Sequence, residues 1–253
     1  MMRNLNVDAV FVLSVKTFED RINHVKRQMA LHNIQYQFIF EFDIPDLNPQ
    51  RLTDTFASED VLARPQQSLV LKHIHAWRMC VEHKLKNILV FEDDVILKPD
   101  FVSRLNEALS IMEKKEIGYL LFLGGADTKV PDSFLLSNDI VIQQPIATAE
   151  AYLTDYFACV NRLDWLAVNR VSLPADFLLR AIDPLCGIVQ YWLKEPIADQ
   201  GSVTGVFESS LDKQRQKHSL LYNYLRYQWQ KINRKKLRKI YAHLKQHFNL
   251  ITK

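Results

Sequence analysis

The chain has 253 residues, of which 48% are hydrophobic and only 6 are Gly and 3 are Cys, and this balance excludes collagen-like, disordered and disulfide-scaffold proteins. The formal net charge of +3 hides a separation of charge: residues 213–253 carry 12 Lys or Arg and no Asp or Glu, which leaves 20 basic and 29 acidic residues in 1–212. We therefore expect one globular domain over residues 1–212 and a basic tail over 213–253 that is directed at a polyanion.

The absence of export signals indicates a cytoplasmic protein. No run approaches the roughly 20 apolar residues that span a bilayer, and Met1–Val15 lacks the basic start and the small-residue cleavage site of a secretory signal. Cys80, Cys159 and Cys186 have no paired spacing typical of a disulfide framework or a zinc site. We expect a reducing compartment, with Cys80 and Cys159 as packing residues.

Strand and helix signals alternate through the first half of the chain. Apolar runs rich in β-branched and aromatic residues predict buried strands, and apolar residues at helical spacing predict helices. In chain order we expect a strand over 8–15, a helix over 18–32, a strand over 36–40, an irregular connection over 43–64, a helix over 68–84, a strand over 88–91, a helix over 100–114 and a strand over 119–123. This order predicts a doubly wound α/β fold around a mostly parallel, Rossmann-type sheet.

The pattern is weaker beyond residue 125. The apolar run Tyr156–Val160 predicts a strand, and residues 162–171 and 176–182 predict helices. Pro184, Pro196, Gly201 and Gly205 are typical of loops.

Three adjacent acids form the strongest functional signal. Glu92, Asp93 and Asp94 directly follow the strand over 88–91 and precede another apolar pair. Because the carboxyl ends of strands in an open α/β sheet face the ligand crevice, these acids are expected where a substrate binds. Their mutual repulsion would be offset by a hard cation with oxygen ligands, Mn²⁺ or Mg²⁺. The alternative is a solvated acidic turn or a helix cap.

At this point the sequence resembles a known family. Leu89–Leu97, followed by Pro99-Asp100-Phe101, is similar to the Asp-x-Asp-type block of the bacterial lipooligosaccharide glycosyltransferases of family 25, which are related to collagen galactosyltransferases. Further blocks agree in order and, with the first, cover most of residues 9–205. These blocks are Phe11–Arg21, Leu71–Trp77, Leu173–Asp183 and Asp199-Gln200.

The resemblance implies a GT-A-like fold and an inverting transfer of a hexose from a nucleotide sugar, most often UDP-galactose, to a lipooligosaccharide or lipopolysaccharide acceptor. It also implies a metal held by Asp94 with Glu92 or Asp93 assisting, which would bridge the two phosphates of the donor. Arg21, His73 and Gln200 match donor-site positions of the family. For Arg21 a solvated surface position is the alternative, and for His73 a satisfied core position.

An inverting enzyme also needs a carboxylate as general base toward the acceptor hydroxyl. Asp183 matches the family block best, Asp155 lies next to an expected strand, and Asp176 reads as a helix N-cap. We expect Asp183, and after it Asp155, to serve in the site.

Two smaller features concern the candidate site. Gly124 and Gly125 follow a strand and can line a sugar pocket through close backbone approach, although a simple turn explains them equally well. His73 and His75 lie two residues apart, so on a helix they face different ways and do not readily share a metal.

The basic tail combines aromatic and cationic residues. Leu220–Trp229 and Lys231–Tyr241 can form amphipathic helices whose apolar side enters a lipid interface while Lys and Arg face anionic headgroups. We expect peripheral association of the tail, 213–253, with the inner face of the bacterial inner membrane, and a glycolipid acceptor. Packing on the domain is the structural alternative, and nucleic acid is the less favoured polyanion.

Two other function classes remain open on these residues. The same acids can serve a metal-dependent nucleotidyltransferase or phosphohydrolase. The tail alone would suit a non-enzymatic membrane or nucleic-acid binding module.

Overall fold

The computed structural model describes residues 4–115, 117–124, 139–146, 148–204 and 206–207, and the single positions 222, 225, 228, 229 and 240. The expected tail over 213–253 therefore lies outside the described residues except at those five positions. Within the described part, no helix combines the length and the apolar character that a membrane span requires.

A seven-stranded sheet forms the centre of the fold. Its order is β2-β1-β3-β7-β5-β8-β6. The strands are β1 (Ala9–Leu13), β2 (Gln37–Ile39), β3 (Asn87–Glu92), β5 (Tyr119–Phe122), β6 (Val141–Gln143), β7 (Ala151–Asp155) and β8 (Val189–Leu193). Five strands share one direction, whereas β7 and β6 run against their neighbours. The expectation of a mostly parallel sheet in an α/β fold is confirmed, with antiparallel β7 inserted near its middle.

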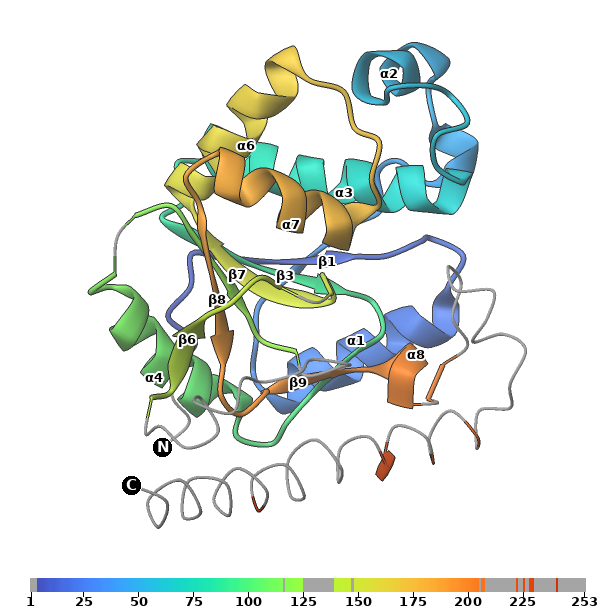
Figure 1. Ribbon diagram of the computed structural model, residues 1–253. Helices are drawn as coiled ribbons and strands as arrows, with labels where there is room; N and C mark the ends of the chain where they lie inside the picture. Colours follow the sequence, from blue (N-terminus) through green and yellow to red (C-terminus); the bar gives the residue numbers. More distant parts are fainter. Residues whose placement is uncertain are drawn as a thin grey trace.

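Helices cover both faces of this sheet (Figure 1). One layer holds α3 (Arg64–Glu82), α6 (Tyr156–Val168) and α7 (Ala175–Leu185), with α2 (Pro49–Thr55) beside it after the 3-10 turn η1 (Ile44–Asp46). The other layer holds α1 (Glu19–Leu31) and α4 (Phe101–Met112). The short helix α8 (Gly201–Thr204) follows the ribbon of β4 (Val95–Leu97) and β9 (Ala198–Gln200), which pair antiparallel.

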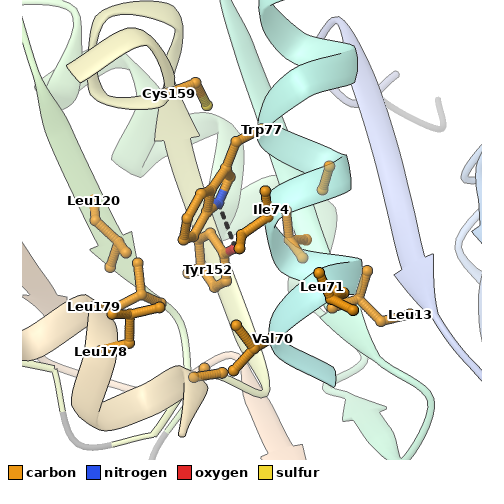
Figure 2. Close-up of a cluster of buried hydrophobic side chains, with 14 of the residues drawn as sticks. Leu13, Val70, Leu71, Ile74, Trp77, Leu120, Tyr152, Cys159, Leu178 and Leu179 are labelled. Carbon is orange, nitrogen blue, oxygen red and sulfur yellow. Dashed lines mark hydrogen bonds between the residues drawn. The ribbon is translucent and has the colours of Figure 1, made fainter. Parts of the chain in front are cut away.

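Each layer has its own apolar core, because strands buried on both faces send alternate side chains to opposite sides. Trp77 on α3 and Tyr152 on β7 lie at the centre of the first core, where the indole N–H donates to the tyrosine hydroxyl at 3.0 Å (Figure 2). Leu178 and Leu179 of α7 close this core from the side. Cys80 and Cys159 are free and fully buried, which confirms them as packing residues.

The second half of the chain departs most from the sequence-based expectations. The run Tyr156–Val160 is the start of α6 and not a strand, and the strand is the preceding segment Ala151–Asp155. A short apolar run does not distinguish a buried strand from a buried helix, and the cap formed by Asp155 decides for the helix. The strand β8 was also not expected.

Two helix ends differ as well. Helix α3 begins at Arg64, earlier than expected, because Pro65 is well suited to the first turn, where no backbone donor is needed. Helix α7 continues through Pro184 to Leu185, where the expectation placed a loop.

Candidate functional site

The connections around β1 diverge at the carboxyl ends of β1 and β3. Helix α1 leads from β1 to β2 on one face of the sheet, and α3 leads from the β2 region to β3 on the opposite face. This divergence makes the ends of β1 and β3 a topological switch point, which is where open α/β sheets bind ligands. Ser14 comes directly after β1 at this edge. Glu92 is the last residue of β3, and Asp93 and Asp94 follow it.

Asp93 is fixed by partners from the first strand and helix. Its Oδ2 accepts a hydrogen bond from Ser14 Oγ at 2.9 Å, and its Oδ1 pairs with Arg21 Nη1 at 2.7 Å. Burial raises the pKa of Asp93, although the Arg21 guanidinium opposes this shift. Arg21 in turn lies against the rings of Phe18 and Phe207. Asp93 and Arg21 therefore form an ion pair. Any contact of either residue with a donor would be made while the two remain paired.

Asp94 is buried but only half satisfied. Its Oδ2 accepts from the backbone N–H of Ser202 at 3.1 Å, and its carbonyl accepts from the N–H of Gly201 at 2.7 Å. A Cβ on Gly201 would lie 2.7 Å from that carbonyl, so only glycine fits there. The Oδ1 atom of Asp94 has no partner. Gln200 pairs with Val95, the residue after Asp94, across the β4-β9 ribbon.

Glu92 faces a second glutamate across the sheet. Its N–H donates to the carbonyl of Glu150 at 2.9 Å, so the two residues are neighbours on adjacent antiparallel strands. Like charges in such positions repel. Burial and the charges of Asp94 and Glu150 raise the pKa of Glu92 well above its ordinary value. Burial also raises the pKa of Glu150 to about 7.

A buried hydrogen-bond chain joins Trp77, Tyr152 and His73 and ends near Glu92. The Tyr152 hydroxyl accepts from Trp77 and lies 2.9 Å from Nδ1 of His73. The hydroxyl proton therefore has Nδ1 as its acceptor, which assigns the ring proton of His73 to Nε2, 3.9 Å from Glu92 Oε1. Burial and the Arg162 charge lower the pKa of His73 to about 3, so the ring is neutral. His75 packs separately against Phe42, as expected from the helical spacing.

Asp176 lies in the first turn of α7, a helix in the layer that covers one face of the sheet (Figure 1). It is not the N-cap, which is Pro174, and its Oδ1 accepts from the N–H of Phe177 at 2.9 Å. Its charge contributes to the raised pKa of Glu92, and burial raises the pKa of Asp176 itself. The carboxylate for which the sequence predicts an ordinary cap is thus close enough to affect the pKa of Glu92.

Asp183 corrects the first choice of general base. Its side chain is fully buried and forms two hydrogen bonds with Arg162, Nε to Oδ1 at 2.7 Å and Nη2 to Oδ2 at 2.8 Å. Gln190 Nε2 donates to Oδ2 at 2.8 Å. With both oxygens engaged inside the core, Asp183 is not available to an acceptor hydroxyl.

Asp155 corrects the second choice. It pairs with Asn87, the first residue of β3, and so lies at the opposite end of that strand from Glu92. Its carboxylate accepts hydrogen bonds from three backbone N–H groups, of Gly118, Tyr119 and Ala158. Asp155 is a helix cap and a clamp on the β5 connection, remote from the acidic block.

Gly124 lies against the carboxylate of Glu150, whereas the sequence suggested contact with a sugar. A Cβ on Gly124 would overlap Oε1 of Glu150 and lie 2.8 Å from Cζ of Phe122. The close approach that glycine permits is therefore made by Glu150. Gly125 lies outside the described residues.

The acids of this edge offer an incomplete ligand set for a divalent cation. Among the described residues, no three His, Cys, Asp or Glu side chains converge as a complete metal cluster. Mg²⁺ and Mn²⁺, however, are commonly held by one or two carboxylates together with substrate phosphates and water. Asp94, with its unpaired buried Oδ1, and Glu92 fit such an incomplete set. Asp93, with both oxygens already engaged, fits less well.

Sequence reasoning missed two members of this edge, Ser14 and Glu150. Ser14 is the first polar residue after an apolar strand, which is a usable signal. Glu150 gave none, because its strand β7 was not expected and its partner Gly124 is 26 positions away.

One cavity of the described structure lies elsewhere. It has a volume of about 520 Å³, lies between α2 and α3, and is lined by Arg51 and Arg78 among others. It contains no residue of the acidic block.

Comparison with known proteins gives three findings. Residues 7–142 match the model of glycosyltransferase family 25 (LPS biosynthesis protein). Procollagen galactosyltransferase 2 of Mus musculus is 23% identical over 132 residues, and that of Homo sapiens is 22% identical over 132 residues. Each match covers 47% of this chain but only 21% of the relative, so the chain corresponds to about a fifth of those proteins.

A glycosyltransferase involved in the glycosylation of the major capsid of PBCV-1 is similar in structure. The match has a TM-score of 0.40 and 11% identity, and covers 87% of this chain and 99% of the other.

Proposed function

This chain belongs to glycosyltransferase family 25, and from that premise we propose that it transfers a hexose from a nucleotide sugar to a saccharide acceptor with inversion. Galactose from UDP-galactose is the proposed donor group, in keeping with the names of the procollagen galactosyltransferases that the chain resembles. Lipooligosaccharide or lipopolysaccharide is the proposed acceptor, in keeping with the family description. A GT-A-like arrangement of the donor site belongs to the same proposal.

One observation supports this proposal most strongly. Asp94 lies at the divergence of the connections around β1, buried and with Oδ1 unpaired. An unpaired buried carboxylate oxygen costs about 1–3 kcal/mol or more unless a ligand satisfies it. A switch point with such an atom is suited to a donor that carries its own cation and phosphates.

Mn²⁺ or Mg²⁺ is the proposed cofactor, held by Asp94 and Glu92. When bound, such an ion supplies Lewis-acid stabilisation of charge on the departing nucleotide. Asp93 keeps the block in place through Ser14 and Arg21. The Nε2 atom of His73 lies 3.9 Å from Glu92 Oε1, and burial lowers the pKa of the ring so that it is neutral there. Arg21 and Gln200 border the block and are the proposed neighbours of the donor.

Asp176 is the proposed general base. It belongs to α7, in the layer on the opposite face of the sheet from α1, which holds Arg21, and its charge contributes to the raised pKa of Glu92. Burial raises the pKa of Asp176, which makes the carboxylate a better proton acceptor than an exposed aspartate. In the transfer, it takes the proton of the acceptor hydroxyl as the new glycosidic bond forms and the bond to the nucleotide breaks.

The basic tail, 213–253, is proposed to bring the enzyme to a glycolipid acceptor at the inner face of the inner membrane. Its 12 Lys and Arg without an acidic residue support attraction to anionic headgroups. The described tail positions Tyr222, Leu225, Trp229 and Ile240 are helical and exposed, as an interfacial helix requires of its apolar side.

Donor binding and turnover test this function. We expect UDP-galactose with Mn²⁺ to raise the melting temperature of the protein and to be hydrolysed slowly to UDP and galactose. Asp94→Asn should lose both effects, because the unpaired oxygen is replaced or neutralised. Asp176→Asn should keep the donor-induced shift but lose at least a hundredfold in transfer to a soluble acceptor analogue.

Two results would contradict the proposal. If no nucleotide sugar of a panel shifts the melting temperature, a nucleotide-sugar donor is excluded. Release of inorganic phosphate or pyrophosphate in place of UDP would favour the phosphohydrolase or nucleotidyltransferase that the same acids can serve. The exposed Asp60→Asn is the matched control and should behave as the wild type.

A further inference from the structure

A small set of buried polar atoms in the described residues has no hydrogen-bond partner. It comprises His73 Nε2, Asp94 Oδ1, Thr148 Oγ1, Trp192 Nε1 and both carboxylate oxygens of Glu150. Glu150 is fully buried, and it is unusual because neither of its oxygens is satisfied. Native proteins rarely leave such groups unpaired, because each costs about 1–3 kcal/mol, and more when charged.

The position of Glu150 in the sheet is well defined. It lies across from Glu92 of β3 on one side and from Gly124, just beyond β5, on the other. Its carboxylate occupies the space that a Cβ on Gly124 would take. Thr148 lies two residues earlier, and its hydroxyl is close enough to the Glu150 carboxyl to oppose the rise in pKa that burial causes. Glu150 is thus held beside the acidic block without being satisfied by it.

We propose that Glu150, with Thr148 beside it, binds hydroxyl groups of the donor hexose, an inference that rests on the proposed function. A carboxylate offers only acceptor oxygens, and adjacent hydroxyls of a pyranose are donors that can satisfy both of them. A diphosphate has no such donors and would be repelled. The hexose is attached to that diphosphate, so it is the part of the donor that reaches the residue next to Glu92 and Asp94.

Gly124 is the positioning residue of this subsite. Any larger side chain would displace the Glu150 carboxylate, because Oε1 lies where the Cβ would be. The glycine that the sequence suggested for direct contact with the sugar would then act through Glu150.

The test separates hexose binding from nucleotide binding. Calorimetry with Mn²⁺ gives the dissociation constants of UDP and of UDP-galactose for the wild type, Glu150→Gln and the exposed control Glu113→Gln. We expect Glu150→Gln to weaken UDP-galactose about tenfold and to change UDP by less than twofold, since one charged hydrogen bond is lost only to the sugar. Glu113→Gln should match the wild type for both ligands.

A second pair of measurements excludes a purely structural role. Without ligand, Glu150→Gln should melt at the same temperature as the wild type or higher, because a buried charge without partners is removed. Gly124→Ala should reproduce the selective loss of UDP-galactose affinity with the glutamate still present.

Other outcomes overturn the inference. Equal weakening of UDP and UDP-galactose would assign Glu150 to the metal and diphosphate, and unchanged affinities would leave it no ligand. A lower melting temperature with unchanged selectivity would make it a structural residue. If the wild-type protein binds UDP but no UDP-hexose, only the proposed hexose subsite is contradicted. If it binds neither ligand, the proposed function is contradicted as well.

Discussion

At the residue scale, neighbouring side chains of one chemical type have different environments. Asp93 has both oxygens engaged by Ser14 and Arg21, whereas Asp94 keeps one oxygen unpaired. The difference comes from the neighbouring elements, because Ser14 after β1 and Arg21 of α1 engage Asp93, whereas α8 supplies only a backbone N–H to Asp94. An acidic triplet is therefore not three equivalent ligands.

His73 gives a prediction for stability against pH. The folded ring has a pKa of about 3, whereas an unfolded histidine titrates near its ordinary value of 6.5. Between pH 6.5 and 3 the unfolded chain therefore binds a proton at His73 that the folded protein does not bind. The contribution of His73 to the free energy of unfolding is present above pH 6.5 and is lost as the pH falls toward 3. Relative to His73→Asn, the wild-type advantage in the unfolding equilibrium should shrink by up to about tenfold per pH unit below 6.

Urea unfolding at pH 7, 6, 5 and 4 in EDTA measures this difference. The exposed His83→Asn serves as the control for loss of a histidine. Stability differences between wild type and His73→Asn that do not change with pH would contradict a neutral buried ring.

At the scale of elements, a buried ion pair joins the second half of the chain. Arg162 on α6 binds Asp183 on α7 through two hydrogen bonds and also donates to Thr154 on β7. Its guanidinium lies 5.1 Å from the centre of the Trp77 ring on α3. Four elements thus meet at one arginine, and the aspartate that the sequence suggested as a catalyst holds them together.

Asp183→Asn should destabilise the protein by about 3–5 kcal/mol, because the Arg162 charge stays buried without its partner. Where the variant is still folded, its transferase activity per folded molecule should be unchanged. Denaturant titration and active-site-normalised rates check both statements. Asp176→Asn should show the reverse pattern, a small change in stability and a large loss of rate, and the same pattern in both variants would contradict these assignments.

At the scale of the whole molecule, charge is divided between the domain and the tail. The acidic residues lie in 1–212, and 12 of the 32 basic residues lie in 213–253. An acidic body with a basic tail is expected to approach an anionic surface tail first, with a strong dependence on salt.

Vesicle binding checks this division. The full chain with Arg234, Lys235, Lys236 and Arg238 changed to Gln should lose at least tenfold in affinity for phosphatidylglycerol vesicles at 0.1 M salt, at about 1 kcal/mol per basic residue. Its activity on a soluble acceptor should be unchanged. The same number of substitutions at Lys26, Arg27, Lys86 and Lys114 of the domain is the control. Equal losses in both variants would mean that only total charge matters.

The sequence determined a large part of this protein by itself. The buried runs of β1, β3 and β5 and the helical spacing in α1, α3 and α4 follow from local patterns, and so does the position of the acids at the end of β3. These features are local because burial on both faces of a strand, or on one side of a helix, selects residue types within a few positions of one another.

Tertiary structure alone decided which acids can act. Asp183 and Asp155 look like candidates until Arg162 and the backbone donors of the β5 connection engage them. Glu150 becomes a candidate only when it pairs with Glu92, and Asp176 only when α7 brings its charge close enough to raise the pKa of Glu92. The physical reason is that a carboxylate is defined by the donors around it, and those donors come from strands and helices that are distant in sequence and adjacent only in the fold.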